Sequence, residues 1–164
     1  MEHFPPFVVF DCNIFIQAFL NPTGSAGKCF DLVCEGRIVL FVSEATLNEV
    51  RTVILRPHIL LRLPNVTSEQ IEAFVSEILY ISQMVENVPA RFSFDRDPDD
   101  EIILNLAIEC DAEYIISWDK DLLDLMTGFD QASKEFRQRH RSLKIVSPGD
   151  FFQNLIGSYL SLKP

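Results

Sequence analysis

Phe7-Val8-Val9-Phe10-Asp11 is the stretch that decides the fold, because four consecutive apolar residues end at an acid. An apolar run of this length, followed by helical and turn signals, predicts a buried strand of a parallel sheet. A similar run, Tyr114-Ile115-Ile116, leads through two residues to Asp119. Ligands of open α/β sheets bind outside the carboxyl ends of the strands. Acids from distant parts of this chain can therefore share one pocket.

Helical patterns separate the apolar runs along most of the chain. Ser43 is placed to cap a helix, and Thr67 with Gln70 has the spacing of a capping box. Asp97-Pro98 combines a cap with a proline at the first helical position. We expect strands at about 7–11, 37–42, 114–117 and 143–146, and helices at about 13–19, 25–35, 44–55, 58–63, 68–85, 98–110, 121–126 and 148–160. Strands alternating with helices predict an α/β fold, a short parallel sheet flanked by helices in one domain spanning 1–164.

The composition is that of an ordinary globular domain: 164 residues, 48% of them apolar and 23% charged. No run of 18 apolar residues is present, and the N-terminus lacks a basic region, so neither a membrane span nor a signal peptide is expected. The cysteines show no CxxC pair and no zinc spacing. Cys12, Cys29 and Cys110 stand in apolar surroundings, which favours buried thiols in a reducing cytoplasm.

The net charge of −10 argues against binding a polyanion through bulk electrostatics. It leaves open a nucleic acid whose phosphates are met by metal ions. Any contact with the nucleic-acid backbone then requires local basic patches.

Four acids stand where an α/β fold would gather them: Asp11, Glu49, Asp100 and Asp119. Two unit charges about 4 Å apart repel by roughly 4 kcal/mol at an effective dielectric near 20. A cleft holding all four carboxylates would be strongly destabilised unless they are protonated or bridged by a cation. Ligands that are all oxygen point to Mg²⁺ or Mn²⁺. The pattern predicts a divalent-metal site.

Five segments in order resemble the motifs of PIN-domain ribonucleases and cover nearly the whole chain. They are Val8–Asn13, Ser43–Val50, Asp97–Ala107, Ser117–Leu122 and Lys144–Phe152. No single segment is specific, but their order and spacing together carry the signal. Ser117 stands where threonine is more usual in the family, and the stretch 127–142 looks long for it, which leaves its structure open.

The resemblance implies a Rossmann-like PIN domain that hydrolyses RNA phosphodiester bonds with Mg²⁺ or Mn²⁺. It implies that Asp11, Asp100 and Asp119 hold the metal, while Glu49 holds a second ion or orients the attacking water. By its offset from Ala107, Asp100 rather than its acidic neighbours takes the catalytic position. A water nucleophile would leave 5′-phosphate and 3′-hydroxyl ends.

The ending at 144–152 is similar to the branch often described as toxin components of toxin–antitoxin pairs. This similarity implies an RNA substrate and a cognate antitoxin. We also expect a homodimer in the cytoplasm.

Three polar residues flank the four acids, and each also has a purely structural interpretation. Asn13 could cap a helix, or it could hold Asp11 or a metal-bound water, as the resemblance implies. Ser117 is interpreted in the same way, as a neighbour that supports the acids. Asp121 is the acid most able to substitute for Asp119. Trp118 could stack on a base, but core packing is favoured.

A basic stretch near the C-terminus is a candidate RNA contact. It includes Arg137, Arg139 and Arg141, together with Lys134 and Lys144. A solvated helix or loop face explains it equally simply.

Two other classes of function remain as alternatives. One is a non-catalytic PIN-like module that binds RNA or a protein. The other is a phosphotransfer domain, which the residues disfavour. A haloacid-dehalogenase-type phosphatase needs a second aspartate where Asn13 stands, and a receiver needs an aspartate at the end of a middle strand, where Phe41-Val42-Ser43 has none.

Overall fold

The computed structural model describes residues 4–160, with side chains described as far as residue 157. The outermost residues of the expected 1–164 domain, 1–3 and 161–164, lie outside the described part. All strands pair in parallel in one sheet with the order β3-β2-β1-β4-β5. The strands are β1 (Phe7–Phe10), β2 (Val39–Val42), β3 (Gln83–Met84), β4 (Tyr114–Ile116) and β5 (Lys144–Val146). The expected α/β fold with a parallel sheet is confirmed.

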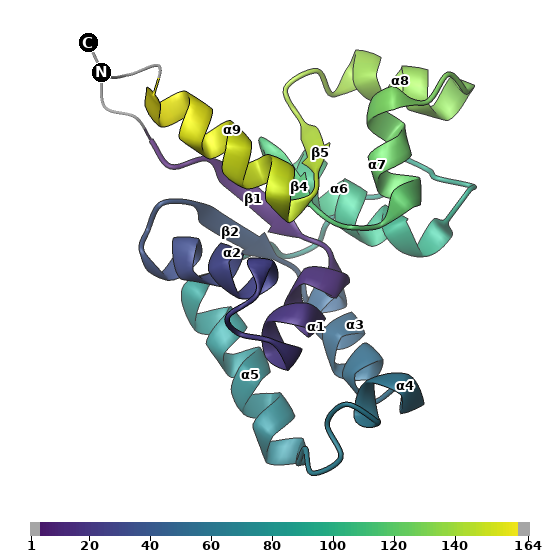
Figure 1. Cartoon of the computed structure of the whole chain (residues 1–164). Coiled ribbons are helices and arrows are strands. Elements are labelled where there is room, and N and C mark those ends of the chain that lie inside the picture. Colours follow the sequence, from purple (N-terminus) through teal and green to yellow (C-terminus); the bar gives the residue numbers. More distant parts are fainter. Residues whose placement is uncertain (1–3, 161–164) are drawn as a thin grey trace.

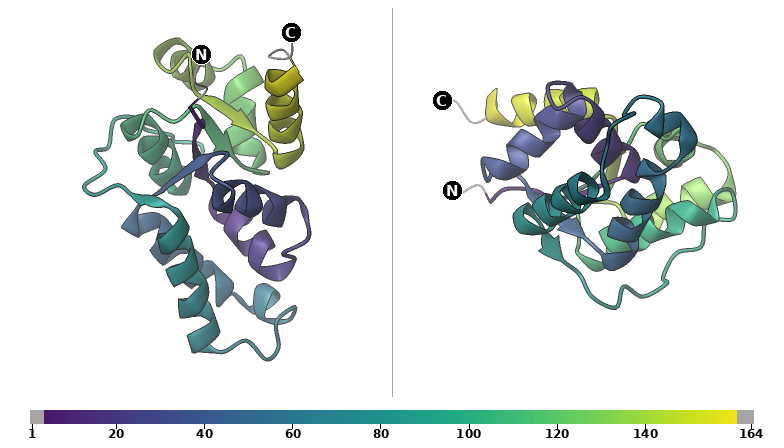
Figure 2. Two further views of the ribbon diagram at one scale, coloured as in Figure 1. Left: turned by 90° about the vertical axis from the view of Figure 1, so that its left-hand side faces the viewer. Right: turned by 90° about the horizontal axis from the view of Figure 1, so that it is seen from below.

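Helices cover both faces of this sheet (Figures 1 and 2). In chain order they are α1 (Cys12–Leu20), α2 (Ser25–Cys34), α3 (Glu44–Ile54), α4 (Pro57–Leu60), α5 (Ser68–Ile81), α6 (Glu101–Glu109), α7 (Lys120–Thr127), α8 (Gln131–Arg139) and α9 (Pro148–Leu160), with a 3₁₀ turn η1 (Pro98–Asp100) before α6. No helix within residues 4–160 is both long enough and apolar enough to cross a membrane.

The core is divided between the two faces because side chains alternate along each strand. Val8 and Phe10 of β1 face a cluster built with α1, α2, α3, α5 and α9. Val9, between them, faces a second cluster built with α6, α7 and α8. The strands are therefore buried on both sides, which explains why they appear in the sequence as continuous apolar runs.

The helix starts that the sequence marks are present in the structure. Ser43 accepts a hydrogen bond from the backbone N–H of Thr46, and Thr67 forms both bonds of a capping box with Gln70. Asp97 caps η1 by accepting from the N–H of Asp99. These local contacts fix the directions in which α3, α5 and α6 leave their loops.

Two expectations about the elements are wrong, and one stretch is left open by the sequence. The helix expected to reach residue 85 ends at Ile81, and the chain then forms the edge strand β3, which pairs with β2. Two residues are too short to give an alternating pattern, so only the tertiary pairing reveals this strand. The start of the helix expected at 98–110 is a 3₁₀ turn. The unassigned stretch 127–142 contains α8, whose start is capped by Asp130.

Candidate functional site

The candidate site lies where the order of the strands reverses along the sheet. β1 is flanked by β2 on one side and by β4 on the other, so the chain leaves β1 and β4 in different directions. Such a switch point leaves a crevice at the carboxyl ends of the two strands. Asp11 follows β1 directly, and Ser117-Trp118-Asp119 follows β4. The fold therefore brings the first and fourth acidic motifs together.

A single hydroxyl joins these two strand ends. Ser117 is completely buried, and its Oγ donates a hydrogen bond of 2.6 Å to Oδ2 of Asp11. The same Oγ accepts a hydrogen bond of 2.8 Å from the backbone N–H of Asp119. Asn13 adds a longer contact of 3.4 Å from its Nδ2 to Oδ2 of Asp11. Ser117 and Asn13 therefore both contact the carboxylate beside which the sequence placed them.

Asp11 is only 8% exposed, and burial raises the pKa of its carboxyl group above the ordinary aspartate value. The hydrogen bonds from Ser117 and from the backbone N–H of Cys12 partly oppose this effect, since they favour the charged form. The charges of Asp119 and Asp97 raise the pKa further. The environment at the carboxyl end of β1 therefore favours the protonated form of Asp11.

Asp100 carries a buried carboxylate oxygen, Oδ2, without a hydrogen-bond partner among the described residues. Burial, followed by the charges of Asp119, Asp97, Asp11 and Asp121, raises the pKa of Asp100 to about 8. An ionised carboxylate here would lack any compensating donor. The position favours either a proton or an external cation.

Glu49 reaches the same cluster from α3. Burial raises its pKa to about 7, and the charges of Asp11, Asp99 and Asp97 act in the same direction. Arg56, an exposed residue beyond the end of α3, opposes them. Of the four acids named from the sequence, Asp11 is thus electrostatically coupled to each of the other three.

Asp97 is a further member of this cluster that the sequence interpretation set aside. Its charge raises the pKa of Asp11, Glu49 and Asp100. Asp97 also caps η1, where it accepts from the N–H of Asp99 at 3.1 Å. The capping role alone is enough to explain an aspartate at this position in the sequence. An aspartate before a proline is so common at helix starts that its second role leaves no local signal.

The acids do not form a preformed chelate. In the part of the chain that is described, no three His, Cys, Asp or Glu side chains converge as a metal-binding group. The fit to a divalent cation rests on two other observations: every candidate donor is a carboxylate oxygen, and Oδ2 of Asp100 is buried without a partner. Such hard oxygen donors suit Mg²⁺ or Mn²⁺.

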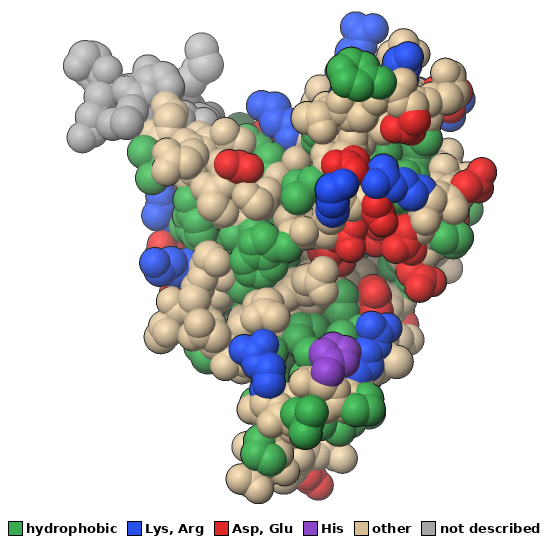
Figure 3. Space-filling view, turned by 45° about the vertical axis from the view of Figure 1, so that its right-hand side comes forward, with side chains coloured by type: hydrophobic (Ala, Val, Ile, Leu, Met, Phe, Trp, Pro, Cys, Tyr) green, Lys and Arg blue, Asp and Glu red, His purple; other side chains and the backbone are tan. Residues whose placement is uncertain are grey.

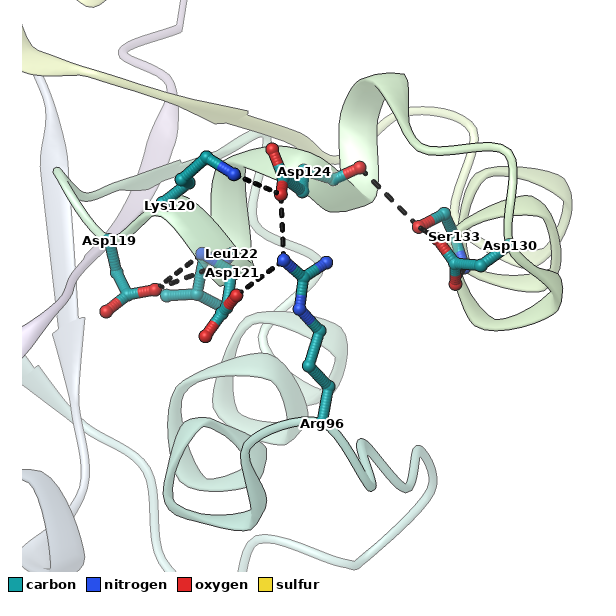
Figure 4. A network of polar contacts seen from close by, with 8 residues as sticks. All are labelled: Arg96, Asp119, Lys120, Asp121, Leu122, Asp124, Asp130 and Ser133. Carbon is teal, nitrogen blue, oxygen red and sulfur yellow. Dashed lines mark hydrogen bonds and ion pairs between the residues drawn. The ribbon is translucent and has the colours of Figure 1, made fainter.

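Asp119 and Asp121 have different surroundings, although they lie two residues apart. Oδ1 of Asp119 caps α7 by accepting from the N–H groups of Asp121 at 2.7 Å and Leu122 at 3.4 Å. Both of these contacts meet the same oxygen of Asp119 (Figure 4). The carboxylate of Asp121 instead binds Arg96 at 2.6 Å. Asp121 is therefore neutralised by a partner, while Asp119 keeps one oxygen for another ligand.

Arg96 connects the loop before η1 to α7. Its guanidinium binds Asp121 and also Asp124 at 2.9 Å, and Asp124 receives a second contact from Lys120 (Figure 4). Figure 3 shows acidic side chains gathered around a hollow, with Lys and Arg side chains on both sides of it. Arg96 is a residue that the sequence interpretation missed, because its partners lie more than twenty positions away.

The arginines of the basic stretch near the C-terminus differ in their surroundings. Arg137 donates to the backbone oxygens of Leu125 and Gly128, both at 2.7 Å, so its guanidinium closes the turn between α7 and α8. Arg139 and Arg141 are exposed. Of the three arginines expected to contact RNA, Arg137 is thus held in a structural role.

Comparison with known proteins identifies the fold. The family model described as PIN domain matches residues 7–121, which include all four acids of the site. The chain is also 33% identical over 153 residues to the uncharacterized protein MJ1680 of Methanocaldococcus jannaschii, covering 93% of this chain and 94% of that protein. The expected family is confirmed. The chain belongs to the PIN-domain family, whose members are generally nucleases.

Proposed function

We propose that this protein is a divalent-metal-dependent endoribonuclease, with Asp11, Glu49, Asp100 and Asp119 as its catalytic and metal-binding residues. The observation that best supports this is the buried, unpartnered Oδ2 of Asp100 among other acids. A carboxyl group whose pKa is raised to about 8 is poorly stabilised as an anion by its own protein. A bound cation would supply the missing positive charge.

We assign different roles to the residues of the site. Asp11, Asp100 and Asp119 would hold Mg²⁺ or Mn²⁺, and Glu49 would hold a second ion or orient the attacking water. When bound, the cation lowers the pKa of a water molecule and neutralises charge on the scissile phosphate. Ser117 fixes the carboxylate of Asp11 and the backbone of Asp119 relative to each other. Arg96 forms an ion pair with Asp121, which partly offsets the negative charge that Asp121 adds to the site.

The two histidines within residues 4–160 do not form a pair for the other common route of RNA cleavage. His58 lies on α4 and His140 packs against Phe92 and Phe136. Attack by the RNA's own 2′-hydroxyl needs an acid–base pair and leaves cyclic phosphates. We therefore expect attack by water, leaving 5′-phosphate and 3′-hydroxyl ends.

We further propose a biological role as the toxin of a toxin–antitoxin pair in the cytoplasm, acting as a homodimer. The resemblance of residues 144–152 to that branch of the family supports it. A neighbouring gene for a small DNA-binding protein would support the pairing, and light scattering of the purified chain measures its oligomeric state.

The alternative is a non-catalytic PIN-like module that binds RNA or a protein. The cluster argues against it, because buried acids that raise one another's pKa reduce stability without benefit to a simple docking surface. A module that only binds would be equally served by neutral residues at these positions.

Incubation of the full chain with end-labelled RNA tests the proposal. We expect cleavage with Mn²⁺, loss of cleavage with EDTA, and recovery when Mn²⁺ is added back. Asp11→Asn should reduce the rate about a thousandfold, which equals about 4 kcal/mol of transition-state stabilisation. Glu113→Gln is the matched control, since Glu113 is an exposed acid beside the amino end of β4.

Three results would contradict the proposed reaction. They are cleavage that persists in EDTA, products that end in 2′,3′-cyclic phosphate, and an Asp11→Asn protein that cleaves as fast as the Glu113→Gln control. The last result would also remove Asp11 from the site.

A further inference from the structure

A small hollow lies next to the acidic site and has a different character. It has a volume of about 370 Å³ and is lined by Asn13, Gln17 and Trp118. This volume falls within the range of roughly 300–1,000 Å³ that is usual for small-molecule sites. Trp118 directly precedes Asp119, and Asn13 contacts Asp11 at 3.4 Å. Two residues that line the hollow are therefore direct neighbours of acids in the site.

Trp118 is exposed, although the three residues before it in the chain are buried. Its side chain is 40% exposed, whereas Ser117 beside it is completely buried. The interpretation that Trp118 packs in the core is therefore wrong. A large aromatic ring partly open to solvent is a stacking surface for a planar ligand.

Two amides complete the lining. Asn13 and Gln17 are four residues apart on α1, so they lie on one face of that helix. Among the described residues, no hydrogen bond uses the side-chain amide of Gln17. An amide offers donors and an acceptor together, which matches the mixed edges of nucleobases.

Charge also distinguishes the hollow from the acidic site. None of its three lining residues is ionisable. The chain carries a net charge of −10 and cannot attract a polyanion through bulk electrostatics. Stacking on an aromatic ring supplies affinity without positive charge, and proteins that bind single-stranded RNA commonly use it.

We propose, building on the nuclease function proposed above, that this hollow is a nucleobase subsite. The base of the nucleotide next to the scissile phosphate stacks on Trp118, and the amide of Gln17 contacts the edge of that base. The phosphate of the same nucleotide lies toward the adjacent acids, whose repulsion a bound cation would offset. Exposed tryptophans also anchor protein partners, but a hollow flanked by two amides beside the acids fits a planar ligand better.

The single tryptophan makes a direct binding test possible. Trp118 is the only tryptophan in the chain, so the one indole N–H signal in a ¹H–¹⁵N NMR spectrum reports on this hollow. The full chain is titrated, with Mg²⁺ present, with each of the four 5′-ribonucleoside monophosphates and with ribose 5-phosphate. We expect the nucleotides to shift the signal saturably and ribose 5-phosphate to leave it in place.

Substitutions then connect binding with cleavage. Trp118→Ala should raise the KM for RNA about tenfold with kcat nearly unchanged, and Trp118→Phe should retain part of the affinity. Gln17→Ala should weaken the nucleotide titration. Tyr80→Ala is the control, since Tyr80 is a 91% exposed aromatic residue on α5.

The outcomes separate this subsite from the function on which it rests. An indole signal that no nucleotide moves, with wild-type KM in Trp118→Ala, overturns the subsite and leaves Trp118 as a protein contact. Equal shifts with ribose 5-phosphate also overturn it, because the signal would then report the phosphate. Nucleotides that shift the signal of a protein unable to cleave RNA would uphold the subsite and defeat the nuclease function.

Discussion

Ser117 and Asp11 are 106 residues apart in the chain, and the hydroxyl of Ser117 donates a 2.6 Å hydrogen bond to the carboxylate of Asp11. Because the same hydroxyl accepts from the backbone of Asp119, it holds the ends of β1 and β4 together at the switch point. This bond also favours the charged form of Asp11, whose burial disfavours it. A buried serine thus keeps one acid of the site ionisable and oriented.

We expect Ser117→Ala to lower the free energy of unfolding by about 1–3 kcal/mol, because it leaves the N–H of Asp119 without its partner and removes the shorter of the two hydrogen bonds to Oδ2 of Asp11. It should also raise the pKa of Asp11 further. Urea titration measures the first effect. Ser117→Thr, which keeps the hydroxyl, is the control, and equal loss in both variants would show that volume rather than the hydrogen bond matters.

The metal-free protein should become less stable as the pH rises from about 4 to about 8. The pKa of Asp100 rises from 3.8 to about 8 and that of Glu49 from 4.5 to about 7. In this window the folded state binds more protons than the unfolded state. Stability is fully present below the unfolded pKa values and is lost as the pH passes the folded ones.

Thermal unfolding in EDTA across this pH range measures the slope. Its upper limit is about 1.4 kcal/mol per pH unit for each group, and solvent screening lowers it for these partly exposed carboxyls. Asp100→Asn should flatten it, whereas Glu113→Gln should leave it unchanged. A profile that rises toward pH 8 would contradict the assigned pKa shifts.

Divalent metal should stabilise the fold through the acids. A ligand at 100 times its dissociation constant adds about 2.7 kcal/mol. Without metal and above pH 8, where Asp100 is ionised, Asp100→Asn should melt at a higher temperature than wild type, since one charge is removed from a repelling group. With Mn²⁺ it should gain less. Equal gains in both proteins would place the metal elsewhere.

Asp97→Asn should separate the two roles of this residue. An asparagine retains a side-chain oxygen that can accept from the N–H of Asp99, so the cap of η1 should survive. The loss of charge should lower the pKa of both Asp100 and Glu49 and weaken the response to Mn²⁺. Melting with and without Mn²⁺ tests this, with Asp31→Asn on α2 as a control acid.

Substitution of Arg137 should affect stability, whereas substitution of Arg139 and Arg141 should not. Arg137→Gln removes donors from two backbone oxygens and should cost about 1–3 kcal/mol of stability. Replacing Arg139 and Arg141 by Gln should leave stability unchanged. If these two contact RNA, the same replacement should raise KM and flatten its salt dependence. An unchanged salt slope would identify them as a solvated face.

Much of the fold could be predicted because its signals are local. The apolar runs at Phe7–Phe10 and Tyr114–Ile116 identify buried strands, and the caps at Ser43 and Thr67 mark where helices begin. These patterns depend on neighbouring residues, so periodicity and spacing are sufficient to detect them. The edge strand β3 escaped detection because its two residues acquire their structure by pairing with β2.

The sequence by itself determined the fold class, the family and the four acids worth testing. Only the tertiary structure decided what surrounds each acid. It paired Asp121 with Arg96, added Asp97 to the cluster, buried Oδ2 of Asp100 without a partner and exposed Trp118. The physical reason is that burial, charge coupling and hydrogen bonding depend on distances between residues far apart in the chain, and residue spacing alone does not encode them.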